Sequence, residues 1–89
     1  MHFEWDRSKA ETNRRKHKVT FDEAVSVFYD ALSATFPDPD SSPSEERLVT
    51  IGQSSRGRLL VVVHAEQDEI IRIISARLAT AHERKRHES

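Results

Sequence analysis

Three segments rich in β-branched residues, joined by short connections, constrain the fold of this chain more than any other feature. They are RLVTIGQ (47–53), RLLVVVHA (58–65) and EIIRIISAR (69–77), with connections of four and three residues between them. β-Branched residues favour strands, and connections this short suit antiparallel hairpins, because a parallel crossover needs about a dozen residues or more. The sequence therefore predicts an antiparallel meander over residues 47–77.

Two arginines interrupt the last of these strands. Arg72 lies among four isoleucines, and Arg77 ends the segment. A buried guanidinium without a partner is costly, so each arginine needs an internal carboxylate such as Glu46, an acidic protein partner or the phosphates of a nucleic acid. Because the two arginines are five residues apart, they lie on opposite faces of a regular strand. One of them can therefore be structural while the other binds a ligand.

The register of the last two strands decides which side chains meet. An even loop in this hairpin places His64 opposite Ile71 and Arg58 opposite Arg77. Two arginines directly opposite each other repel, so this arrangement suits the binding of an anion better than it suits stabilisation of the fold.

The first hairpin is compatible with two registers. An even loop places Arg47 opposite His64, whereas an odd loop with a bulge at Gly57 places Glu46 there. The sequence leaves both registers open.

Three capping signals predict helices outside the meander. Asp6 precedes a polar stretch with little apolar surface, where it can cap a first helix. Thr20 and Glu23 have the spacing of a capping box, and the apolar residues that follow recur at helical spacing. Thr80 and Glu83 repeat the capping-box spacing near the C-terminus. We expect two N-terminal helices and one C-terminal helix.

Two shorter segments complete the expected elements. HFEW (2–5) is compatible with a short strand, and ALSATF (31–36) predicts another. PDPDSSPSEE (37–46) contains three prolines and predicts a surface loop that is too short to separate domains. The predicted fold is a single α+β domain over residues 1–89, with helices packed on a mostly antiparallel sheet of four to five strands.

The net charge of −1 conceals a strong charge pattern. Residues 1–18 carry six lysines and arginines against three acids, residues 19–46 carry seven acids and no lysine or arginine, and residues 47–64 carry three arginines and no acid. A near-neutral chain does not coat nucleic acid through bulk charge, but the pattern is compatible with one basic face opposite an acidic segment.

Composition also bounds the cellular setting. Cysteine is absent, which excludes disulfides and thiolate metal sites and is compatible with a reducing cytoplasm. The polar start MHFEWDRSK lacks the apolar core of a signal peptide, and the longest apolar run, LLVVV (59–63), is too short to span a bilayer. These features predict a cytoplasmic protein without membrane association.

Several motifs are spread along nearly the whole chain. Residues 3–24 contain F-x-W-D, N-x-x-K-H and V-x-F-x-E-A; residues 36–64 contain E-E-R and the hairpin IGQSSRGRLLVVVH; residues 71–84 begin with IRIISAR. In this combination and order, the sequence resembles the BrnT family of toxins from bacterial type II toxin–antitoxin pairs.

The resemblance implies both a fold and a function. It implies a RelE-like ribonuclease fold and cleavage of RNA that inhibits translation and growth. It also implies neutralisation by a BrnA-type antitoxin that binds the toxin in a hetero-oligomer, for example with two copies of each protein (2:2). Operator DNA is then contacted only through the antitoxin.

The residues can be matched to the chemistry that such a function needs. Metal-independent RNA cleavage needs a base for the 2′-hydroxyl, cations for the charge on the phosphoryl group and an acid for the departing 5′-oxygen. Histidine and glutamate exchange protons, whereas arginine supplies charge and forked donors. The five histidines show no metal-ligand spacing, so we expect neither a metal nor another cofactor. The predicted catalytic residues are Lys16, His17, Glu46, Arg47, Arg72 and Arg77, and the predicted RNA-binding residues are Arg14, Arg15, Arg58 and His64.

The candidates also have structural interpretations. His17 can stabilise a helix end, and Arg72 can form an internal ion pair. Arg58 can be a solvated hairpin residue, and His64 can be a hydrogen-bonded core side chain. Position within the motifs favours a functional role for Lys16, His17, Arg72 and Arg77.

The predicted function is that of an endoribonuclease toxin inhibited by a partner that covers its basic face. One alternative is a non-catalytic nucleic-acid- or protein-binding module that uses the same basic patch. Another is a purely structural interaction protein. Binding modules usually present aromatic stacking platforms or a recognition helix, and this chain shows neither clearly.

Overall fold

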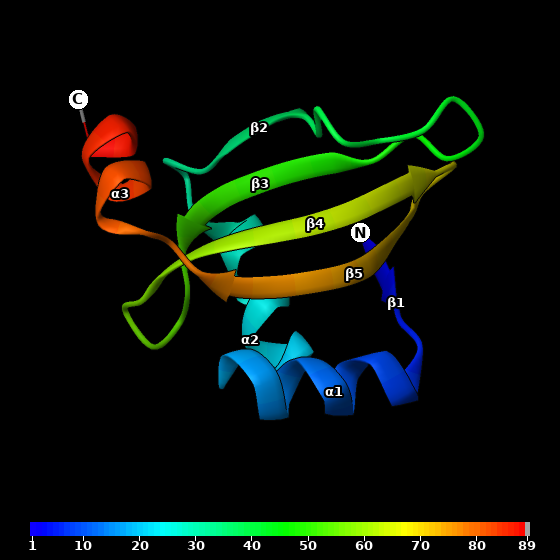
Figure 1. The fold of residues 1–89 in the computed structure, drawn as a ribbon, viewed down its shortest axis with the longest axis horizontal. Coiled ribbons are helices and arrows are strands. Elements are labelled where there is room, and N and C mark those ends of the chain that lie inside the picture. The colour runs from blue at the N-terminus through cyan, green and yellow to red at the C-terminus, as the bar shows by residue number, and fades with distance from the viewer. Residues whose placement is uncertain (89) are drawn as a thin grey trace.

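The computed structural model describes residues 1–88, which form a five-stranded mixed sheet with three α-helices (Figure 1). The strand order is β1-β5-β4-β3-β2. β1 runs parallel to β5, whereas the other three pairings are antiparallel. The elements are β1 (His2–Glu4), α1 (Arg7–His17), α2 (Phe21–Ser26), the 3-10 helix η1 (Val27–Tyr29), β2 (Ala34–Pro37), β3 (Leu48–Gln53), β4 (Leu59–Gln67), β5 (Ile70–Leu78) and α3 (Ala81–Glu88).

The α+β class is confirmed, and the predicted meander corresponds to β3, β4 and β5. The expectation of a mostly antiparallel sheet missed one feature, because β1 adds a parallel edge strand and makes the sheet mixed. Parallel pairing is possible here since the whole chain from α1 to β4 lies between the two strands. No helix within residues 1–88 is long and apolar enough to cross a membrane.

The helices begin where the capping residues predict. The Asp6 Oδ1 atom accepts a hydrogen bond from the Lys9 amide at 2.9 Å, and Thr20 Oγ1 accepts one from the Glu23 amide at 3.1 Å. At α3 the capping box is complete, because Thr80 Oγ1 accepts from the Glu83 amide and the Glu83 carboxylate accepts from the Thr80 amide. The Glu23 carboxylate instead turns into the protein.

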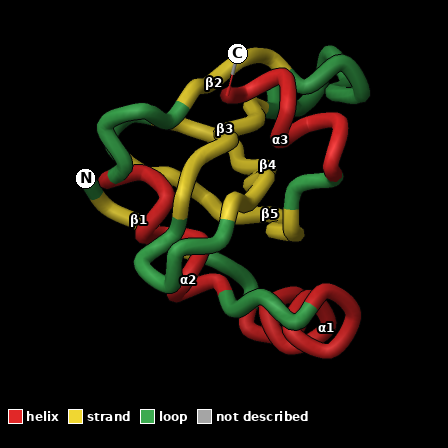
Figure 2. Tube along the Cα trace, turned by 90° about the vertical axis from the view of Figure 1, so that its left-hand side faces the viewer, coloured by secondary structure: helices red, strands yellow, loops and turns green. Residues whose placement is uncertain are grey.

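One face of the sheet, here called the helical face, packs against α2 and η1. Figure 2 shows α2 and α3 on different sides of the strands. Full burial of Phe21, Leu60 and Ile73 places these large side chains at the centre of the core. Each such side chain stabilises the fold by about 1.5–3 kcal/mol. The core on this face consists of Val19, Phe21, Ala24, Val27, Leu60, Val62, Ile71, Ile73 and Ala76.

Helix α1 lies along β5 (Figure 1). β1 pairs only with the start of β5, from Ile70 to Arg72, so the backbone further along would be a free edge. The side chain of Asn13 fills this place: its Nδ2 donates to the Ala76 carbonyl at 2.8 Å, and its Oδ1 accepts from the Ala76 amide at 3.1 Å. The same Nδ2 donates to the Val19 carbonyl at 3.0 Å. Asn13 therefore closes the sheet edge and fixes the start of α2.

The register of β4 and β5 differs from the prediction. His64 lies opposite Ile73, and Arg77 lies opposite Val61. The predicted pairs of His64 with Ile71 and of Arg58 with Arg77 are wrong, because the two-residue loop falls one position later and the register shifts between Val63 and His64. Ile74 is the extra residue of this β-bulge.

The first hairpin also adopts neither predicted register. Leu48, and not Arg47 or Glu46, lies opposite His64. The loop is odd, since the Ser54 amide donates to the Arg58 carbonyl and three residues lie between them. Gly57 has φ of 75°, a left-handed conformation that favours glycine.

Candidate active site

The β-bulge at Ile74 changes which face Arg72 occupies. Arg72 lies opposite Ala65 and Arg77 lies opposite Val61. Since Ala65 and Val61 are four residues apart on one strand, they point to the same side. The bulge therefore brings both arginines onto one face, against the expectation of opposite faces.

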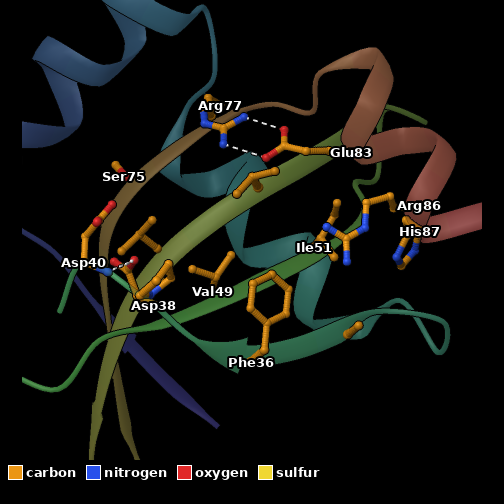
Figure 3. Close-up of a pocket in the computed structure, with 14 residues that line it drawn as sticks. Phe36, Asp38, Asp40, Val49, Ile51, Ser75, Arg77, Glu83, Arg86 and His87 are labelled. Atoms are coloured by element: carbon orange, nitrogen blue, oxygen red, sulfur yellow. Dashed lines mark hydrogen bonds and ion pairs between the residues drawn. The ribbon is translucent and has the colours of Figure 1, made fainter.

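This face carries an open groove of about 770 Å³ (Figure 3). We call it the groove. Apolar side chains form its floor, and its two walls are the loop at residues 38–40 and helix α3. Phe36 at its edge is 46% exposed, which is unusual for a large aromatic side chain. The lining residues are Ala34, Phe36, Asp38, Pro39, Asp40, Val49, Ile51, Val61, Val63, Ser75, Arg77, Glu83, Arg86 and His87.

Arg77 is held at the groove by Glu83 of α3. Its Nη1 donates to Glu83 Oε1 at 2.7 Å and its Nη2 donates to Glu83 Oε2 at 2.8 Å, which makes a bidentate ion pair. The hydrogen bonds from Arg77 lower the pKa of Glu83 to about 2, and the same pair raises the pKa of Arg77. Sequence analysis suggested Glu46 as the internal partner of Arg77, which is wrong, since the carboxylate comes from α3.

Two further arginines among the predicted site residues, Arg72 and Arg47, do not line the groove. The Arg72 Nη2 atom donates to Glu45 Oε1 at 2.6 Å, in an ion pair in which both side chains remain substantially exposed. Arg47 immediately precedes β3; its Nε is buried and has no hydrogen-bond partner among residues 1–88. Because this Nε is buried, it is an unsatisfied donor of the interior and not a group that a ligand reaches directly. Glu46, adjacent to Arg47, is exposed.

His64 does not lie at the groove. Its side chain has no exposed surface and packs against η1, with its ring edge-on to Phe28 at a centroid distance of 4.9 Å. The Nε2 atom lies 2.8 Å from Thr50 Oγ1. Burial lowers the pKa of His64 to about 4. The prediction that His64 binds RNA is wrong for this structure, since a side chain without exposed surface cannot contact a ligand. The interpretation as a core side chain holds instead.

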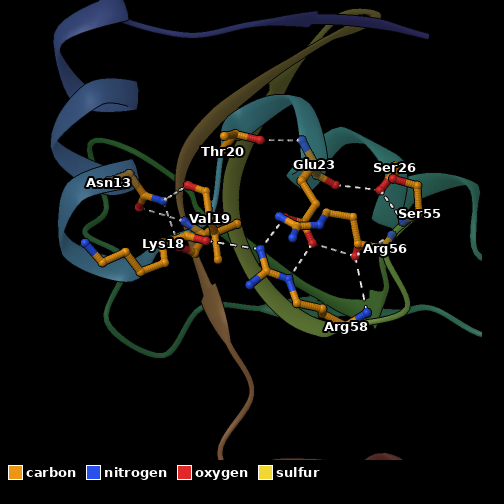
Figure 4. A network of polar contacts seen from close by, with 11 residues as sticks. Asn13, Lys18, Val19, Thr20, Glu23, Ser26, Ser55, Arg56 and Arg58 are labelled. Carbon is orange, nitrogen blue, oxygen red and sulfur yellow. Dashed lines mark hydrogen bonds and ion pairs between the residues drawn. The ribbon is translucent and has the colours of Figure 1, made fainter.

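Arg58 belongs to a buried polar network (Figure 4). Its guanidinium makes a bidentate ion pair with Glu23, in which Nε lies 2.9 Å from Glu23 Oε2, and its Nη2 also donates to the Lys18 carbonyl at 3.1 Å. Ser54 Oγ donates to the same carboxylate at 2.7 Å. The hydrogen bonds from Arg58 lower the pKa of Glu23. This network ties the first hairpin to α2, so Arg58 has a structural role and is not a freely solvated hairpin residue.

The candidates on α1 lie apart from the groove lining. Lys16 and His17 end the helix, and neither lines the groove. Arg14 forms an exposed ion pair with Glu11 at 2.6 Å, and Arg15 lies 3.9 Å from the same carboxylate. Of the ten predicted site residues, the structure gathers Arg72 and Arg77 on one face of β5, whereas Glu46 and Arg47 come just before β3, which β4 separates from β5.

Sequence reasoning missed the groove residues contributed by α3. Glu83 was recognised only as a capping residue, and His87 was not among the predicted site residues. The signal that could have identified Glu83 is its position just after Arg77, across a turn that brings α3 back over the strand. Within residues 1–88, no group of three or more histidine, cysteine, aspartate or glutamate side chains is placed to hold a metal ion.

The fold of the chain is similar to that of a solved ribonuclease toxin. A crystal structure of BrnT from Brucella abortus superposes with a TM-score of 0.70 and 25% sequence identity, over 90% of this chain and 97% of that chain. No curated protein sequence matches the chain. The α+β fold is thus one that a small ribonuclease toxin adopts.

The family model of the ribonuclease toxin BrnT of type II toxin–antitoxin systems matches residues 5–83. The chain therefore belongs to the BrnT family, which confirms the resemblance found in its motifs. Membership of a type II toxin–antitoxin family implies an antitoxin partner.

The structure also explains several motif residues as parts of the scaffold. Asn13 closes the edge of β5, and Ser54 and Arg58 bind the Glu23 carboxylate. At Gly52, an added Cβ would lie 2.8 Å from Ser33 Cβ and 2.9 Å from a Val27 methyl group, so only glycine fits there. The motif residues that remain for chemistry are mainly the arginines of β5.

Proposed function

We propose that this protein is a RelE-like endoribonuclease toxin that cleaves RNA in the groove without a metal ion, acts in the cytoplasm and is neutralised by a BrnA-type antitoxin. The single observation that carries the proposal is the placement of Arg72 and Arg77 on one sheet face by the bulge at Ile74. The proposal also retains Arg47 as a candidate cation, although its Nε is buried.

The proposed reaction needs no group beyond the protein and the RNA. The 2′-oxygen attacks the adjacent phosphorus, the bond from phosphorus to the 5′-oxygen breaks, and the products are a 2′,3′-cyclic phosphate and a free 5′-hydroxyl. A base takes the 2′-hydroxyl proton, and an acid supplies one to the 5′-oxygen. Arginines at the phosphate stabilise the additional negative charge of the transition state. For the proton transfers, the proposal retains Lys16, His17 and Glu46 as candidates.

The shape of the groove suits a single RNA strand. Its apolar floor offers a surface for bases, and Phe36 presents an exposed aromatic ring that can stack on one of them. Arg77 and Arg72 can hold phosphates along the same face. In the proposal Arg14 and Arg15 of α1 extend the contact with RNA outside the groove.

Cleavage in excess chelator tests the proposal. The purified protein is incubated with total RNA in EDTA, alongside an Arg77→Ala variant and an Arg84→Ala control on the exposed side of α3. We expect cyclic-phosphate ends from the wild type and the control, and a loss of about 100-fold or more with Arg77→Ala, since charge-stabilising donors are worth about 10²–10³ in rate.

Two outcomes would refute this proposal. Cleavage that is abolished by chelator and restored by manganese would show that the metal-independent mechanism is wrong. Binding of RNA without any cutting would support the non-catalytic binding module instead. Thermal denaturation of each variant separates loss of chemistry from loss of fold.

The proposed antitoxin blocks the RNA path. The groove joins an apolar floor to arginines, so a partner that presents apolar and acidic side chains can cover it. We expect the affinity for antitoxin to fall less steeply with salt than the affinity for RNA, because an apolar interface is insensitive to screening while phosphate contacts release counterions. Equal slopes across a salt series, or an antitoxin complex that still cuts RNA, would contradict occlusion of the groove.

A further inference from the structure

The guanidinium of Arg77 has two edges that can each bind an anion. Its five N–H donors lie in a plane, and adjacent pairs form forks that match the two oxygens of a carboxylate or a phosphate. The Nη1–Nη2 fork is occupied by Glu83, and Nη1 also donates to the Leu78 carbonyl at 3.2 Å. No hydrogen bond within residues 1–88 engages Nε. The Nε–Nη2 fork is therefore available to a ligand.

Glu83 is itself held in place by the turn that joins β5 to α3. Its Oε1 accepts from the Thr80 amide at 2.9 Å, and its own amide donates to Thr80 Oγ1 at 3.1 Å. The turn is tied to the sheet through the Ala79 amide, which donates to the Leu59 carbonyl at 2.9 Å. Hydrogen bonds thus hold both the backbone amide and the carboxylate of Glu83. A carboxylate held in this way restricts the orientation of the Arg77 guanidinium that it binds (Figure 3).

We infer that Glu83 is a positioning residue of the ribonuclease site: it holds one edge of the Arg77 guanidinium so that the Nε–Nη2 edge binds the phosphodiester to be cleaved. This inference rests on the proposed function. α3 contributes no buried residue to the core, and the Arg77–Glu83 ion pair is a principal link between the helix and the sheet. In this arrangement α3 completes the site, since it supplies the carboxylate that orients the arginine.

The alternative role for Glu83, in which it only masks the charge of Arg77, makes a different prediction. If Glu83 only masked Arg77, its removal would expose a cation, and both RNA affinity and cleavage would rise. If Glu83 positions Arg77, its removal frees the guanidinium to adopt other rotamers, and the chemical step slows while ground-state affinity changes little. The sign of the effect on cleavage thus separates the two assignments.

The experiment is a double-mutant cycle between Glu83→Gln and Arg77→Lys, measured as single-turnover cleavage of a short RNA. A 2′-deoxy analogue of the same sequence gives the affinity without cleavage. With Glu83→Gln alone we expect the rate to fall by about 10- to 100-fold, the scale of a misplaced catalytic group, and the analogue affinity to change by less than about threefold. In the Arg77→Lys background, which retains charge but lacks forks, Glu83→Gln should have almost no further effect.

Two controls address the structural role of Glu83 at the start of α3. Thr80→Ala removes the hydrogen bond that the Glu83 amide donates, but it keeps the bond from the Thr80 amide to the Glu83 carboxylate and the ion pair with Arg77, so its loss of cleavage rate should be much smaller than that of Glu83→Gln. Glu88→Gln removes a charge elsewhere on α3 and should leave the cleavage rate unchanged. An equal loss of activity in Thr80→Ala, or the same loss from Glu83→Gln in both Arg77 backgrounds, would overturn the inference, as would any gain of activity.

A spectroscopic measurement keeps the inference separable from the proposed function. The Nε–H signal of Arg77 in a ¹⁵N-labelled protein should shift on addition of the 2′-deoxy analogue, and in Glu83→Gln the signal should be broadened or lost through faster exchange with water. A wild-type protein that cleaves no RNA would refute the proposed function. An Arg77 Nε–H signal that is unchanged in Glu83→Gln would refute this inference but not the proposed function.

Discussion

Replacement of Arg58 by methionine should destabilise the fold, although sequence analysis assigned this arginine to RNA. The Glu23 carboxylate is almost completely buried and receives hydrogen bonds from Arg58 and from Ser54 (Figure 4). Without Arg58, its charge remains in the interior with one hydroxyl donor. Removal of one partner of a buried ion pair costs about 3–5 kcal/mol, because the other charge loses its compensation.

The loss of stability expected for Arg58→Met lies below the top of this range. The Arg58 side chain is 26% exposed, and Arg56 Nη1 already lies 3.7 Å from Glu23 Oε1 and can move closer. We therefore expect a loss of about 2–3 kcal/mol in the free energy of unfolding. For a chain of this size, that corresponds to a fall of about 10–20 °C in the melting temperature.

Denaturation followed by circular dichroism measures this effect. The matched control is Arg56→Met, which removes an exposed arginine from the same carboxylate and should cost less than about 0.5 kcal/mol. The double variant Arg58→Met with Glu23→Gln removes both charges and should recover part of the loss. If Arg58→Met melts within about 2 °C of the Arg56→Met control, the assignment of Arg58 to the scaffold is refuted.

The pH dependence provides an independent check on the same reasoning. In the wild type, the hydrogen bonds from Arg58 hold the pKa of Glu23 below its usual value, so the stability that the pair provides is present above the unfolded-state pKa and is lost as pH falls below it. In Arg58→Met, protonation of Glu23 instead removes the cost of burying its uncompensated charge. The difference in stability between the two proteins should therefore narrow as the pH falls from 7 to about 4.

Two further predictions concern buried polar side chains. Because burial lowers the pKa of His64 to about 4, the folded state resists protonation of this ring, and stability should fall as the pH drops from about 6.5 to 4. This contribution, about 3 kcal/mol at most, should be absent from urea denaturation of His64→Leu, and equal pH profiles of the two proteins would refute it. Asn13→Ala leaves the Ala76 amide and carbonyl unpaired at the edge of β5 and should cost about 2–4 kcal/mol, whereas the exposed Thr12→Ala should not; faster amide exchange at Ala76 is the corresponding signal.

Features of the fold that depend on neighbouring residues could be predicted from the sequence. Asp6, Thr20 and Thr80 begin helices where their side chains can accept a backbone amide three residues on, an interaction that operates within one turn. The β-branched segments became strands, and their short connections made them hairpins, since chain geometry allows little else. The motifs also sufficed to assign the family, because they are dispersed along nearly the whole chain.

Which side chains come together could be established from the folded structure and not from sequence patterns. The register shift at Ile74 moves Arg72 to the face of Arg77, whereas regular strand periodicity predicts opposite faces. Likewise, the carboxylates that pair with Arg58 and Arg77 come from α2 and α3. The positions of these helices over the sheet cannot be predicted from a local sequence pattern. A guanidinium on a long side chain can reach several carboxylates, and burial and register select among them.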